Sequence, residues 1–138
     1  MARNRIRALG LIARLADRRL EEDATRLTAL RGRIAGLNAQ KADLRFKAAH
    51  EGRVLSAEAA PYVACFLRSV RAEERRLDAD LARLAQAAEM QERVVRASFA
   101  EARVMGHALK DATAARQAGL DRQDRIALDE AGLRRQPD

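Results

Sequence analysis

The sequence predicts an all-α protein, a long antiparallel two-helix coiled-coil hairpin with an overhanging C-terminal helix. Three observations predict this fold. Apolar residues recur about every 3.5 residues for about 45 residues from Ile6, which is the spacing of a coiled-coil seam. Charged residues are 34% of the 138 residues and aromatic residues only 3%, as in long solvated helices. Two Pro and seven Gly are too few for the many turns of a β-rich or α/β fold.

The first helix is predicted from about residue 4 to about 51. No Pro interrupts this segment, and Gly52 is a plausible stop just after it. A coiled-coil seam occupies heptad positions a and d. Position a reads Ile6, Ala13, Leu20, Leu27, Ile34, Lys41 and Ala48, and position d reads Leu9, Ala16, Asp23, Leu30, Leu37, Leu44 and Glu51.

A turn is predicted at about 52–60, followed by a second helix at about 61–130 and a frayed tail at 131–138. Pro61 suits the first turn of a helix, where its missing N–H matters least, so a start near Ala60 is favoured over a start capped by Ser56. The second helix has a seam of its own. Position a reads Leu67, Glu74, Leu81, Ala88, Val95, Ala102 and Leu109, and position d reads Val70, Leu77, Leu84, Gln91, Ser98, Met105 and Ala112.

A break of about nine residues permits the two helices to pack antiparallel as one domain, 1–138. We predict a monomer in which Ile34 lies beside Leu81 and both termini lie at the same end. Polar residues inside a seam select the register at some cost in stability. In this register they form two matched layers, Lys41 beside Glu74 and Asp23 beside Gln91.

The sequence favours a protein that acts by binding other proteins, and we expect no catalytic site, cofactor or metal. His50 and His107 are too far apart along a straight hairpin to share a metal, and Cys65 has no neighbouring ligands. No apolar run approaches the roughly 20 residues of a membrane span. The apolar stretch before Arg14 is too short for a secretory signal, and a mitochondrial presequence is a minor alternative. We therefore expect a cytoplasmic protein.

A basic stripe is predicted near the N-terminus. Six Arg and one Asp lie in the first 20 residues. Arg3, Arg7, Arg14 and Arg18 fall within about 60° of arc on a helix, flanked by Arg5 and Arg19. Three interpretations remain open: a solvated basic face, contact with an acidic protein surface, or contact with nucleic acid. The protein partner ranks first, because the segment lacks aromatic residues for stacking on bases.

A second candidate contact lies at the start of the second helix, where Tyr62 and Phe66 are one turn apart. These rings either pack the end of the hairpin or contact a partner at its tip.

The chain resembles the flagellar FliJ family and its injectisome relatives, the YscO-type stalk proteins. The first helix opens with a basic, apolar segment containing Ile6, Leu9, Ile12 and Leu15. After the break comes A-P-Y-V-A-C-F-L-R-S-V-R-A-E-E-R-R-L, and the chain ends in G-L-D-R-Q-D-R-I-A-L-D-E-A-G-L-R-R-Q-P-D, which is similar to that family's tail. Unlike typical members, the chain lacks Trp and has an Ala-rich central seam.

The resemblance implies a non-enzymatic central stalk of a bacterial flagellar or type III secretion export ATPase. The end with both termini would enter the hexameric ATPase, with Arg3, Arg7, Arg14 and Arg18 as candidate contacts. The opposite end, with Tyr62 and Phe66, would contact the FlhA-like export gate. Export chaperones are further implied partners, and the location is cytoplasmic at the membrane-associated export apparatus. The alternatives are a generic coiled-coil scaffold or dimerisation protein and a nucleic-acid-binding helical hairpin.

Overall fold

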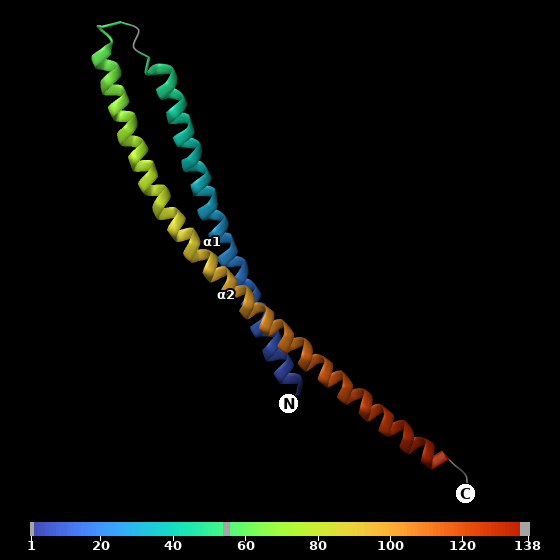
Figure 1. Cartoon of the computed structure of the whole chain (residues 1–138). Helices are drawn as coiled ribbons and strands as arrows, with labels where there is room; N and C mark the ends of the chain where they lie inside the picture. Colours follow the sequence, from blue (N-terminus) through green and yellow to red (C-terminus); the bar gives the residue numbers. More distant parts are fainter. Residues whose placement is uncertain (1, 54–55, 136–138) are drawn as a thin grey trace. The chain divides into compact units, whose positions relative to one another are not determined.

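Two long helices make up nearly all of the described chain. The computed structural model describes residues 2–53 and 56–135. Helix α1 spans Ala2–Glu51 and helix α2 spans Ala60–Arg135 (Figure 1). Within these described residues there is no strand. The all-α prediction is therefore confirmed.

The helices extend further at the chain ends than the sequence indicates. Helix α1 starts at Ala2, before the expected residue 4. Helix α2 continues to Arg135, beyond the expected end at about residue 130, and residues 136–138 of the predicted tail lie outside the described part. Arg134 and Arg135 occupy the last turn, where positive charge interacts favourably with the partial negative charge of the helix C-terminus.

A short turn precedes α2. The Ala59 amide donates to the Ser56 hydroxyl at 3.2 Å, and the Val63 amide donates to the Ala59 carbonyl at 3.0 Å. Ser56 thus satisfies a donor in the turn before the helix, while Pro61 lies in the first turn, as its missing N–H requires. Residues 54 and 55 of the predicted turn lie outside the described residues.

Gly52 ends α1 through a close approach rather than through a left-handed backbone. No described glycine has a positive φ. The Gly52 amide donates to the Ala48 carbonyl at 2.9 Å. A Cβ at Gly52 would lie 2.3 Å from that carbonyl oxygen and 3.0 Å from Leu67 Cδ2. A side chain here would therefore force the backbone to move.

We expect Gly52→Ala to lower the thermal midpoint of unfolding, because the added methyl group collides with backbone. Gly32→Ala is the matched control, since a Cβ there meets nothing within 4 Å and Gly32 lies inside α1. Because alanine has a better helix propensity than glycine, Gly32→Ala should stabilise the protein by about 0.8–1 kcal/mol. Circular dichroism at increasing temperature measures the thermal midpoints of both variants. Equal shifts in the same direction would contradict the assigned close approach.

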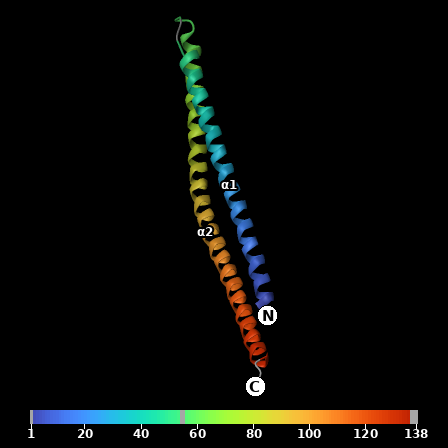
Figure 2. The same ribbon diagram turned by 90° about the vertical axis from the view of Figure 1, so that its right-hand side faces the viewer.

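The described residues form two compact units, each with a segment of both helices. The loop unit is Glu22–Val95, and the terminal unit combines Met1–Glu21 with Arg96–Asp138. In the loop unit the α1 and α2 segments lie side by side in both ribbon views (Figures 1 and 2).

Ion pairs join the two helices of the loop unit in reverse order along α2. Arg31 Nη2 lies 2.9 Å from Glu92, Lys41 Nζ lies 2.5 Å from Asp78, and Arg45 Nε lies 3.3 Å from Glu74. Each pair has at least one side chain that is more than half exposed, so each contributes at most about 1 kcal/mol. Their value is in selecting which residues of the two helices meet.

These contacts correct one polar layer and support the other. Lys41 pairs with Asp78, one turn from the predicted Glu74, and Glu74 pairs with Arg45. A flexible lysine reaches the more exposed Asp78 carboxylate. Asp23 and Gln91 do meet: the Gln91 side-chain amide donates to the Asp23 carbonyl at 3.0 Å.

The core of the loop unit is a narrow seam of aliphatic side chains. Leu77 is the most buried, at 2% exposed, and Leu27 and Val70 are each 7% exposed. Asp23 is also 7% exposed, so the seam includes a buried carboxyl group. Burying a large aliphatic side chain contributes about 1.5–3 kcal/mol, which makes these residues the main source of stability in this unit.

The buried residues of the terminal unit have smaller side chains, whereas the larger seam residues Ile6, Leu9 and Leu20 are half-buried. Its buried residues are Ala13, Ala16, Ser98 and Ala102. Arg19 Nη1 forms an ion pair with Glu101 at 3.2 Å beside them. Small side chains bury little apolar area, so this unit gains less from each seam layer than the loop unit does. All of residues 121–135 are exposed.

Candidate functional site

The basic stripe on α1 is a surface feature of the terminal unit. Arg3, Arg7, Arg14 and Arg18 are all exposed and lie off the buried seam. Of the flanking residues, Arg19 is held by Glu101, and Arg5 borders an open groove between Ile6 and Ala112. The stripe therefore presents guanidinium groups, which bind carboxylates and phosphates through planar donor pairs.

Three aliphatic side chains accompany these arginines. Leu11 is 56% exposed, Ile12 is 44% exposed and Leu15 is 53% exposed. Sequence reasoning noted Ile12 and Leu15 as part of an apolar opening segment but did not identify this surface. The available signal was their heptad position: all three fall outside a and d, where a coiled coil normally exposes polar residues.

The aromatic residues near the break are divided between surface and seam. Tyr62 is 79% exposed, whereas Phe66 is half-buried. The interpretation of Tyr62 as packing for the hairpin end is therefore wrong, because most of its ring faces solvent. Phe66 retains a packing contribution, and Cys65 between them is an exposed free thiol.

A second aromatic pair lies in the last two turns of α1. The rings of Phe46 and His50 stack with centroids 4.2 Å apart and planes 30° apart. His50 Nδ1 lies 3.1 Å from the Phe46 carbonyl oxygen. Phe46 is 61% exposed, so the loop unit presents aromatic surface on both helices. Sequence reasoning gave no function to Phe46, although its (i, i+4) spacing from His50 is the signal for such a stack.

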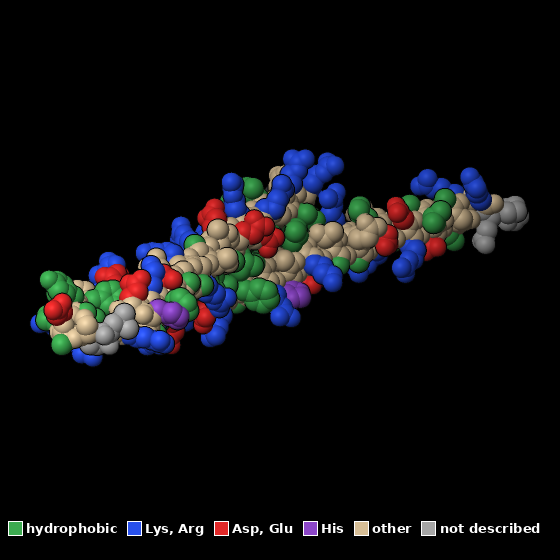
Figure 3. Space-filling model, turned by 90° about the horizontal axis from the view of Figure 1, so that it is seen from above, with side chains coloured by type: hydrophobic (Ala, Val, Ile, Leu, Met, Phe, Trp, Pro, Cys, Tyr) green, Lys and Arg blue, Asp and Glu red, His purple; other side chains and the backbone are tan. Residues whose placement is uncertain are grey.

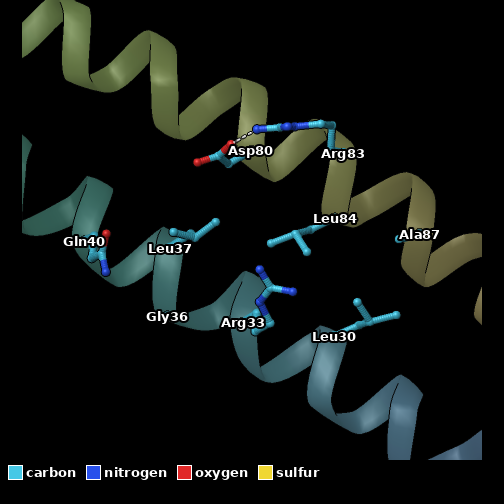
Figure 4. A pocket seen from close by; sticks show the side chains of 9 residues that line it. All are labelled: Leu30, Arg33, Gly36, Leu37, Gln40, Asp80, Arg83, Leu84 and Ala87. Carbon is cyan, nitrogen blue, oxygen red and sulfur yellow. Dashed lines mark hydrogen bonds and ion pairs between the residues drawn. The ribbon is translucent and has the colours of Figure 1, made fainter.

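A groove of the loop unit lies between the helices (Figure 4). Its apolar lining includes Leu30, Leu37 and Leu84, and an Arg83–Asp80 ion pair lies at its edge. The groove has a volume of about 660 Å³ and is open to solvent. Small-molecule sites usually enclose most of the ligand. This groove does not enclose a ligand in that way.

The surface is rich in charge on both helices (Figure 3). Within α2, Arg76 donates two hydrogen bonds to Glu73, and this contact holds the pKa of Glu73 below its ordinary value. A lowered carboxyl pKa stabilises the folded state at neutral pH, and the contribution is lost as the pH falls through the lowered pKa. Both side chains are exposed, so the pair acts on helix stability and not as a site.

The described residues contain neither a group of metal ligands nor a membrane-spanning helix. Over 2–53 and 56–135, no three His, Cys, Asp or Glu residues are grouped as metal ligands. Within those described ranges, neither helix has an apolar stretch long enough to cross a bilayer.

No protein-family model, curated protein or solved structure matches this chain.

Proposed function

We propose that the two helices form an antiparallel coiled-coil hairpin, with α2 extending beyond α1 at the C-terminal end. The reversed order of the Arg31–Glu92, Lys41–Asp78 and Arg45–Glu74 ion pairs supports this arrangement. The short connection between Glu51 and Ala60 supports it as well, because short connections favour antiparallel neighbours.

We further propose that this hairpin is a non-enzymatic central stalk of a bacterial flagellar or type III secretion export ATPase. The observation that carries the proposal is the exposed basic stripe of Arg3, Arg7, Arg14 and Arg18 on the terminal segment of α1. A stalk that binds inside the central pore of an ATPase ring needs exposed side chains that can contact the ring. These side chains must not be the ones that pack its own two helices together. The stripe meets that requirement.

In this proposal the two units have different partners. The terminal unit docks in the ATPase hexamer through its arginines. The loop unit contacts the FlhA-like export gate through Tyr62 and Phe66, and the high exposure of Tyr62 supports a contact there. Export chaperones are further proposed partners. The protein acts as a cytoplasmic monomer at the membrane-associated export apparatus.

Charge reversal of Arg3, Arg7, Arg14 and Arg18 to Glu should weaken binding to the export ATPase of the same organism. Unscreened charges steer encounter, so we expect the association rate to fall about 10- to 100-fold at low salt. The difference should shrink above about 0.1 M salt, where the Debye length is about 10 Å. Surface plasmon resonance over a salt series measures both effects, and circular dichroism checks that helicity is kept.

The matched control reverses Arg68, Arg71, Arg75 and Arg93, which are also exposed and lie in the loop unit. This variant has the same net charge but should retain ATPase binding. If the stripe variant instead lost affinity for DNA or RNA while ATPase stimulation stayed intact, the nucleic-acid alternative would replace the stalk. Concentration-dependent mass without ATPase binding would indicate a dimerising scaffold.

A further inference from the structure

A solvent-facing apolar stripe lies beside the arginines of the terminal unit. Leu11, Ile12 and Leu15 are each 44–56% exposed on two consecutive turns of α1. The residues that face the seam in the same stretch are Ala13 and Ala16, both buried. The larger aliphatic side chains of this segment therefore point away from the seam, which reverses the usual amphipathic arrangement.

Arginines flank the stripe on both sides. At about 100° per residue, Leu11 and Leu15 lie about 40° apart. Arg7, Arg14 and Arg18 lie on one side of this pair, and Arg5 and Arg19 lie on the other side, with Ile12 between those two arginines and about 60° from Leu15. An isolated exposed leucine needs no explanation, but the Leu11–Leu15 pair edged by cations, with Ile12 among the arginines of one edge, forms one mixed surface.

We propose that Leu11, Ile12 and Leu15 are the apolar centre of a docking surface for a protein that has an apolar pocket edged by carboxylates. This inference rests on the proposed function, in which the export ATPase supplies that pocket. Charge complementarity identifies the partner: the arginines of α1 require acidic groups around the pocket. The aliphatic centre requires that the pocket exclude water.

A protein pocket fits the surface better than an anionic membrane does. Helices that lie in a bilayer interface usually add Trp or Phe to the apolar face, and residues 2–21 contain no aromatic residue. The apolar stripe of Leu11, Ile12 and Leu15 has only three large side chains, and each is about half covered by its neighbours. Arg19 is also held by Glu101 at 3.2 Å, which reduces its availability to lipid phosphates.

The two components of the surface should affect different kinetic steps. Exposed charges at an interface rim act mainly on the association rate. Side chains that enter a water-excluded pocket act mainly on the dissociation rate, because they must be resolvated when the complex separates. The apolar contribution should therefore persist in salt that screens the arginines.

The double variant Leu11→Ala/Leu15→Ala tests this division. Both side chains are exposed and alanine favours helix, so helicity and melting should be unchanged. We expect the dissociation rate from the purified export ATPase to rise about 30-fold, with the same salt dependence of association as the unsubstituted protein. Met90→Ala/Val94→Ala is the matched control, with two exposed aliphatic residues one turn apart in the loop unit, and its dissociation rate should not change.

Each outcome is decisive. If the unsubstituted chain binds the ATPase and the leucine variant dissociates equally slowly, the docking surface is overturned while the stalk survives. If the unsubstituted chain does not bind, the stalk proposal fails and the docking surface fails with it. The same two proteins are also mixed with vesicles of equal phosphatidylcholine and phosphatidylglycerol. Leucine-dependent vesicle binding, with ATPase binding unaffected by the substitution, would overturn the protein pocket in favour of a membrane surface.

Discussion

Leu77→Ala is expected to be the most destabilising simple truncation of the chain. Leu77 is 2% exposed and, together with Leu44, lines a small pocket of the loop unit. Truncating a buried leucine removes its transfer free energy and leaves a cavity, at a cost of about 2–5 kcal/mol. Folded domains are stable by only about 5–15 kcal/mol, so the variant should lose a large share of its stability.

Urea unfolding followed by circular dichroism measures this loss. Met90→Ala is the control in the same helix, because Met90 is 61% exposed and truncation should change the free energy of unfolding by less than about 0.5 kcal/mol. Leu77→Asp should go further and melt the loop unit, since it adds an unpaired charge to the seam. Equal effects of Leu77→Ala and Met90→Ala would mean that the seam is misassigned.

The double substitution Asp23→Leu/Gln91→Leu is expected to raise stability and reduce specificity. Asp23 is 7% exposed and lies 3.9 Å from Arg26, and Gln91 donates to the Asp23 carbonyl. Replacing a buried polar or charged cluster with apolar side chains often stabilises by about 1–4 kcal/mol. The same layer also selects the register, so its removal should permit alternative pairings of the helices.

Two measurements separate these effects. The urea midpoint should increase in the double variant. Cysteines placed at positions 31 and 92 should be joined within one chain of the parent by a flexible bis-maleimide, because the long side chains of Arg31 and Glu92 meet at their tips, with 2.9 Å between Arg31 Nη2 and Glu92 Oε1. In the leucine variant, crosslinking should become less efficient and crosslinks between chains should appear. Higher stability with unchanged crosslinking would show that the ion pairs alone select the register.

The helices follow from local properties of the sequence. A seam period of about 3.5 residues, the absence of Pro before Pro61 and the position of Gly52 are sufficient to place α1 and the start of α2. The exact end of α2 depends less on local sequence. Helix continues through Gly132 to Arg135, because the penalty for one glycine is small compared with the helix that precedes it.

One candidate site could likewise be predicted from local sequence, and the other could not. The arc of Arg3, Arg7, Arg14 and Arg18 follows from helical geometry alone, so the sequence could predict an exposed basic stripe. The exposure of Tyr62 could not be predicted. A ring near a turn packs or projects according to the side chains opposite it, and those depend on how the two helices meet.

What the sequence by itself determined is the all-α class, the seam and the position of the break, because each depends on residues within a few turns of one another. Only the tertiary structure decided that Lys41 meets Asp78 instead of Glu74, and that Leu11 and Leu15 face solvent while Ala13 and Ala16 are buried. A slide of one helical turn changes the partner of every seam residue and leaves the heptad pattern unaltered. The energy difference between such registers is a sum of many side-chain contacts across the two helices, and no local pattern contains it.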